Sequence, residues 1–169
     1  MILTYEQVAA DLLKWIRDFV EVPHPAFGRF PPCPYARKAR LENDFEVRVG
    51  TDPMSDLIEL AEKGIPKRVV VIAYDPKLYP HSVFSEMLNR ANLDYLLPKN
   101  LLVLKDHPET PDIVNGVCLN QGTYALALVQ ELSDLNEKAA MLAKKGFYQA
   151  WPEKYLQALF KHRIDPRTV

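Results

Sequence analysis

The stretch RVVVIAY at residues 68–74 constrains the fold more than any other part of the 169-residue chain. It is an unbroken run of apolar, mostly β-branched side chains, so both of its faces need to be covered. Strands of this kind lie in the middle of a sheet that has helices packed against both surfaces. The run therefore predicts a central strand in a protein that mixes helices and strands.

Helical and strand patterns alternate around this run. A capping box at Thr4 and Gln7 begins a helix over 4–20, and residues 45–49 alternate as a half-buried strand does. The other predicted elements are helices at 53–63 and 80–95, strands at 101–104 and 123–130, a helix between a Ser133 cap and Gly146, and a helix that starts at Pro152. The Ala and Leu content of 123–130 would also suit a helix. We predict a single domain over 1–169 of the α/β class, with α+β as the alternative. It would contain a small, mainly central sheet of about four strands, an N-terminal helix and two C-terminal helices.

Composition excludes several classes of function. The net charge is −1 and the sequence pI is about 6.4, so no global field attracts nucleic acid or an anionic membrane. No apolar run approaches the roughly 20 residues of a membrane span. Glu6 and Asp11 interrupt the segment where a secretory signal would be apolar, and two cysteines make no disulfide framework. We expect a cytoplasmic protein with reduced thiols that binds neither nucleic acid nor membrane.

The segment VPHPAFGRFPPCPYARKARL at 22–41 concentrates unusual chemistry. Its prolines exclude a helix or central strand over 22–36 and predict an extended segment. Three interpretations of Cys33 stay open. It is a nucleophilic or redox thiol beside a helix start and several cations, a metal ligand with His24 and His107, or a small apolar residue in a rigid strap. The basic side chains that follow Cys33 either bind a carboxylate or propionate or form a solvated face.

A second irregular stretch, DHPETPDIVNGVCLNQG at 106–122, contains no predicted element. His107 at its start could act as a base, as a metal or haem ligand, or as a hydrogen-bonded surface residue. Asn115 and Gln121 could line a pocket or close the turns of the loop itself. We expect His81 and His162, which lie near helix ends, to be structural or exposed.

These two segments carry a family resemblance. The motif positions are Pro23, His24, Pro25, Gly28, Arg29, Cys33 and Pro34, followed later by Arg68, His107, Pro108 and Asn115. With Phe27 and Tyr35 in place of Leu and Phe, they resemble a small bacterial family with the pattern Pro-His-Pro-x-Leu-Gly-Arg, then Cys-Pro-Phe. More distantly, the layout looks like the YqcI/YcgG family, whose characterised members are haem-dependent enzymes that hydroxylate nitrogen.

The resemblance implies a tailoring enzyme of specialised metabolism, a haem-dependent oxygenase that acts on a small nitrogen-containing molecule. His107 would be the axial ligand of the haem iron and His24 a distal or second ligand. The implied propionate or substrate carboxylate partners are Arg29, Arg37 and Arg40, the implied substrate-binding residues are Asn115 and Gln121, and Cys33 would shape the pocket wall or supply a thiolate. The alternatives are a non-catalytic pathway partner without a cofactor and a Cys33 thiol-dependent enzyme. A homodimer or a partner protein stays open.

Overall fold

The computed structural model describes residues 1–168 and contains a mixed four-stranded sheet. Its strands lie in the order β1 (Phe45–Val49), β2 (Val69–Tyr74), β6 (Ala125–Glu131) and β3 (Leu101–Asp106). β1 and β2 are parallel, whereas β6 runs antiparallel to both of its neighbours. The predicted α/β class is confirmed, and 123–130 forms a strand rather than a helix.

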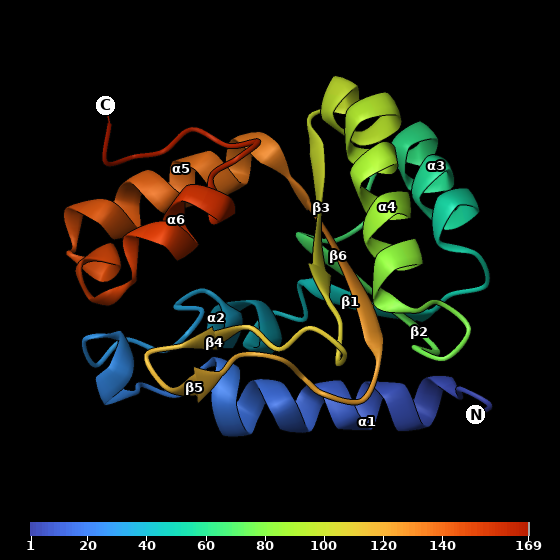
Figure 1. Ribbon diagram of the computed structural model, residues 1–169, viewed down its shortest axis with the longest axis horizontal. Helices are drawn as coiled ribbons and strands as arrows, with labels where there is room; N and C mark the ends of the chain where they lie inside the picture. The colour runs from blue at the N-terminus through green and yellow to red at the C-terminus, as the bar shows by residue number, and fades with distance from the viewer. Residues whose placement is uncertain (169) are drawn as a thin grey trace.

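Helices cover both faces of this sheet. They are α1 (Tyr5–Trp15), α2 (Ala36–Leu41), α3 (Pro53–Lys63), α4 (His81–Ala91), α5 (Leu132–Lys144) and α6 (Glu153–Leu159). Helix α1 packs Val8 and Leu12 against Val71 and Ala73 on one face. On the other face, α3 and α4 lie side by side and bury a larger core that includes Ile72 (Figure 1). β2 is therefore covered on both sides, as its continuous apolar run requires.

The predicted caps begin two of these helices. The Thr4 hydroxyl accepts a hydrogen bond from the Gln7 backbone N–H at 3.3 Å, although the Gln7 side chain bonds Asp11 rather than closing the box. At α3, the Asp52 carboxylate accepts from the Ser55 N–H, and Pro53 takes the first helical position. The N-terminal helix continues to residue 20 as predicted, but its last turn, Ile16–Val20, is a π-helix.

A third cluster joins the proline-rich segment to the C-terminal helices. Phe30 and Tyr35 pack against the side chains of α5, the 3₁₀ turn Phe147–Ala150 and α6. The Phe27 ring stacks on Trp151 with centroids 4.7 Å apart. Segments from opposite ends of the chain therefore lie together (Figure 1).

Three local predictions need correction. The predicted extended segment 22–36 contains a 3₁₀ turn at Pro25–Phe27, followed by Gly28 and Arg29 with φ of 64° and 69°. The stretch 106–122 contains the two-stranded hairpin β4 (Ile113–Val114) and β5 (Val117–Cys118). The N-cap of α5 is Glu131 rather than Ser133, whose hydroxyl donates to the Glu131 carboxylate.

The outer edge of β3 is protected by a side chain rather than by another strand. After α4, the chain continues through a π-helical turn, Asn92–Leu96, and a 3₁₀ turn, Leu97–Lys99. The Asn92 amide donates to the Val103 carbonyl at 3.0 Å, and its oxygen accepts from the Val103 N–H at 2.8 Å. This pair of bonds satisfies the edge of the strand and fixes α4 against β3. None of the helices within residues 1–168 has the length and apolar character needed to cross a membrane.

Candidate functional site

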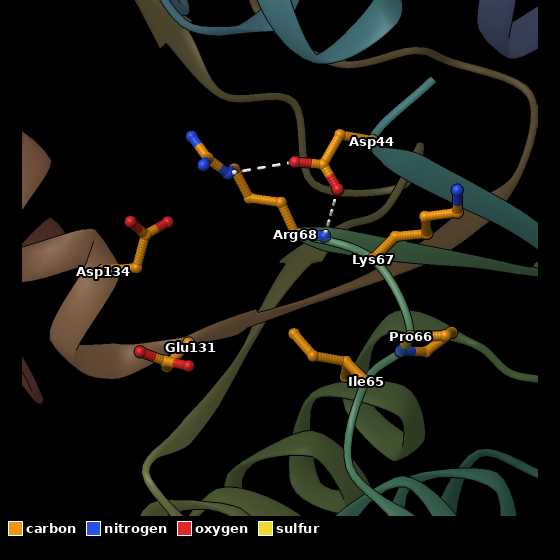
Figure 2. Close-up of a pocket in the computed structure, with 7 residues that line it drawn as sticks. All are labelled: Asp44, Ile65, Pro66, Lys67, Arg68, Glu131 and Asp134. Carbon is orange, nitrogen blue, oxygen red and sulfur yellow. Dashed lines mark hydrogen bonds and ion pairs between the residues drawn. The ribbon is translucent and has the colours of Figure 1, made fainter. Parts of the chain in front are cut away.

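A hollow of about 320 Å³ is open to the surface and is lined by both acidic and basic side chains. It lies where β1 and β2 begin and β6 ends. Figure 2 shows Arg68 beside Asp44, with Glu131 and Asp134 across the hollow. The Arg68 guanidinium pairs with Asp44 at 3.3 Å, and Asp134 pairs with Lys138. Asp44, Arg68 and Asp134 are therefore already paired with protein groups, and Lys67 is the remaining cation of the lining.

The second hollow is a groove of about 170 Å³ along the outer edge of β3, between α4 and the end of α6. We call it the β3 edge groove. Its lining combines apolar side chains with polar and basic ones: Ser85, Leu88, Asn89, Asn92, Leu102, Val103, Leu104, Lys105, Ala158, Leu159, Lys161 and His162. A concave, partly apolar site with a few polar groups is the general form of a small-molecule site.

Lys105 is the central polar group of this groove. Strand alternation places it on the same face of β3 as Leu101 and Val103, which belong to the core beneath α4. Its Nζ lies 2.7 Å from His81 Nε2 and 3.3 Å from Ser85 Oγ. His81 and Ser85 are four residues apart on α4, so both reach the same point of the strand.

The surroundings of this amine lower its pKa. Desolvation lowers the pKa of Lys105 and outweighs the attraction of the nearby Asp112 carboxylate. The pKa of His81 is also lowered, by desolvation first and then by the charge of Lys105 and the His107 ring, against the opposing pull of Glu109 and Asp112. In the His81 tautomer with its proton on Nδ1, Nε2 accepts a hydrogen bond from Lys105 Nζ.

His107 lies at the end of β3 and is buried, with 1% of its surface exposed. The Glu109 N–H donates to its Nδ1 at 3.1 Å, so the proton of a neutral ring lies on Nε2, which donates to the Tyr79 carbonyl at 2.8 Å. Its ring also contacts the rings of His81 and Phe84. Both ring nitrogens are therefore used inside the protein in this conformation.

Gln121 lies beside His107 in the same network, which closes the long loop. Asp106 accepts hydrogen bonds from Asn120 Nδ2 at 2.7 Å and from the Gln121 N–H at 3.0 Å. The Gln121 side-chain oxygen accepts from the backbone N–H groups of Thr123 and Tyr124. Desolvation raises the pKa of Asp106 despite these bonds. In this conformation Gln121 closes a turn, the second of the two roles that its residue type allowed.

Cys33 and Arg40 bind the end of the first helix. The Cys33 N–H donates to the Val20 carbonyl, and Arg40 forms a bidentate pair with Glu21 at 2.6 and 2.8 Å. Cys33 is exposed as a residue, yet desolvation raises the pKa of its thiol more than the neighbouring backbone N–H groups lower it. Arg40 is thus already paired with a carboxylate of the protein, and Cys33 lies in a segment that straps the helix end.

His24, Asn115, Arg29 and Arg37 lie elsewhere. His24 Nδ1 accepts from the Ala26 N–H at 3.0 Å, and Asn115 donates to the carbonyls of Ala26 and Ala150. Asn115 therefore fastens the hairpin to the proline-rich segment and to the C-terminal cluster. Arg29 and Arg37 are exposed. The sequence-predicted site residues thus fall into separate hydrogen-bonded groups, and none of them lines the β3 edge groove.

His107 and Arg40, two of the residues that the resemblance implies for haem binding, are engaged within the protein in this conformation. His107, the implied axial ligand, would have to break two hydrogen bonds and leave the core, and Arg40 would have to leave Glu21. Within residues 1–168, no group of three or more His, Cys, Asp or Glu side chains is arranged to hold a metal ion. Haem binding stays a prediction from the resemblance.

Sequence reasoning missed Lys105, Ser85 and the role of His81. A usable signal was present in LLVLKD, because alternation along the strand places Lys105 on the same side as the buried Leu101 and Val103. The His81–Ser85 spacing indicates a shared helix face. The packing of α4 on β3 brings that helix face against this strand, and the sequence alone does not reveal this packing.

Comparison with known proteins gives no further guide to this site. No protein-family model matches the chain, and no curated protein or solved structure matches it significantly. A function can therefore be inferred only from the geometry of the groove.

Proposed function

We propose that the protein is an enzyme that acts on a small carbonyl compound through the side-chain amine of Lys105. The observation that carries the proposal is that Lys105 lines the groove and that its Nζ lies within hydrogen-bond distance of both His81 Nε2 and Ser85 Oγ. Desolvation is a recognised way to turn a lysine into a nucleophile near neutral pH, because it disfavours the ammonium form.

The geometry assigns a role to each neighbour. A neutral amine has two hydrogens, which His81 and Ser85 can accept, and its lone pair then stays available for attack on a carbonyl carbon. His81 Nε2 takes a proton from the attacking nitrogen as the carbon–nitrogen bond forms. That proton goes to the carbonyl oxygen, one further proton comes from solvent, and water leaves as the carbon–oxygen bond breaks. The product is an iminium between Lys105 and the substrate.

An iminium withdraws electrons from the adjacent carbon, so it facilitates making or breaking a bond at that position. The apolar side chains Leu88, Leu104 and Leu159 of the groove would keep water from hydrolysing the iminium too early. This mechanism needs no cofactor.

Reductive trapping tests the proposal. The protein is incubated at pH 7 with butanal and cyanoborohydride, and the modified lysines are mapped by peptide mass spectrometry. We expect Lys105 to be alkylated faster than Lys99, an exposed lysine just before β3. Replacing His81 by Gln should slow the trapping at Lys105 but not at Lys99. Modification that simply follows exposure, with Lys99 ahead of Lys105, would overturn the proposal.

A further inference from the structure

The charge of the β3 edge groove is one-sided. Its lining contains the basic groups Lys105, Lys161 and His162 and no carboxylate. Lys161 and His162 follow α6, while Lys105 belongs to β3, so the basic groups lie on different walls of the groove. The carboxylates that act on His81 are Glu109 and Asp112, which come from the loop after β3 and are not part of the lining.

Apart from Ser85, the remaining residues of the lining are apolar or carry an amide. Leu88, Leu102 and Leu104 supply hydrocarbon surface. The Asn92 amide is occupied by Val103. The volume of about 170 Å³ is below the 300–1,000 Å³ typical of sites for drug-sized ligands, so the groove suits a smaller molecule.

We infer that the groove binds small oxo acids, whose carbonyl reaches Lys105 while the carboxylate is held by Lys161 and His162. The inference rests on the proposed function for the carbonyl end and adds the recognition of the anionic end. A carboxylate that enters the groove is attracted by the Lys161 ammonium, whereas a neutral methyl ester is not. The short apolar chain beyond the carbonyl would lie on the leucine surface.

Two probes of the same shape test the anionic end. Trapping by cyanoborohydride is compared for 2-oxobutanoate and its methyl ester, each in the wild type, in Lys161→Gln and in Lys154→Gln. Lys154 is an exposed lysine of α6 outside the groove and serves as the matched control. To correct for the intrinsic reactivity of each probe, the rate at Lys105 is divided by the rate at Lys99.

We expect Lys161→Gln to slow the relative trapping of 2-oxobutanoate roughly fivefold, the effect of one ion pair at a partly exposed site. Trapping of the ester should be unchanged, and Lys154→Gln should behave as the wild type. Equal effects of Lys161→Gln on acid and ester, or no effect on either, would overturn the inference while leaving the proposed function standing.

A binding measurement separates the two proposals further. Butanoate lacks the carbonyl that traps, and its binding is followed by the backbone amide NMR shifts of β3 and α6. If butanoate shifts these signals and neither oxo probe is trapped at Lys105, the anion site stands and the amine chemistry is wrong. If butanoate leaves the groove signals unmoved in the wild type, the anion site is wrong.

Discussion

Asn92 holds the proposed site together, and its replacement gives a prediction that can be worked from the structure. Its amide makes two hydrogen bonds to Val103, two residues before Lys105 along β3. Asn92 and Val103 have only 5% and 3% of their surface exposed. In Asn92→Ala the Val103 N–H and carbonyl lose their partners in a place that water reaches poorly. A buried backbone group left without a partner costs about 1–3 kcal/mol.

We expect Asn92→Ala to lose about 3 kcal/mol of unfolding free energy, because partial water entry offsets some of the cost of the two groups. For a domain of this size, that corresponds to a fall in Tm of roughly 6–12 °C. The matched control is Asn89→Ala, an exposed position one turn earlier that should change Tm little. Calorimetry gives the Tm, and hydrogen exchange should show faster exchange at the Val103 amide.

Asn92→Asp sharpens the same test. The aspartate keeps the oxygen that accepts from Val103 N–H but, when ionised, has no proton to donate to the Val103 carbonyl. Burial disfavours its ionised form, so this variant should regain stability as the pH falls and the carboxyl is protonated. The reasoning would be refuted if Asn92→Ala unfolded within 2 °C of Asn89→Ala, since the two bonds would then contribute nothing.

Three further predictions concern other parts of the fold. Burial raises the pKa of Tyr74, whose hydroxyl donates to Asp56 at 2.8 Å, so the unfolded chain loses this proton first. The wild type should therefore lose stability as the pH rises above about 10. In urea titrations, Tyr74→Phe should lack the loss of stability that comes from this hydroxyl. At pH 7 the variant should be about 1.5 kcal/mol less stable than the wild type, because the hydrogen bond to Asp56 is missing. Desolvation raises the pKa of the Cys33 thiol, so iodoacetamide should alkylate Cys33 more slowly at pH 7 in the folded protein than in the urea-unfolded chain. Faster alkylation in the folded protein would favour the alternative of a thiol-dependent enzyme. Arg40→Ala should lower the urea midpoint more than Arg37→Ala, because only Arg40 forms a bidentate ion pair; equal midpoints would contradict a structural role for that pair.

The framework of the fold could be predicted because it depends on local patterns. The apolar run at 68–74 is explained by its place between β1 and β6, under helices on both faces. Proline and cap residues predicted the start of α3 correctly. These signals are read within one turn or one strand, so they do not require knowledge of distant neighbours.

The hairpin β4–β5 was missed although its signal was present. Asn115 and Gly116 both have positive φ, 50° and 81°, and lie between the apolar pairs Ile113–Val114 and Val117–Cys118. Asn-Gly between apolar residues is a strong signal for a tight hairpin turn. The prediction for 106–122 was based on the length of the stretch without an element and not on this dipeptide.

The candidate site could not be predicted because its residues meet only through tertiary packing. Lys105 and His81 are 24 positions apart, and nothing in either segment identifies the other as its partner. Conversely, His107 and Cys33 were predicted as site residues from their residue type and from the family motif. In the structure both ring nitrogens of His107 are hydrogen-bonded within the protein, which its residue type does not reveal.

The protonation of Lys105 is the most direct test of the proposed chemistry. The ¹³Cε and ¹⁵Nζ signals of Lys105 can be followed from pH 5 to 11 in the folded wild type, with Lys99 as an internal reference. We predict that Lys105 titrates clearly below the ordinary lysine pKa of about 10.4, because desolvation disfavours its ammonium form. A titration midpoint at or above that value would mean that Lys105 is a conventional ammonium at neutral pH, and it would contradict the proposal that its amine attacks carbonyl substrates.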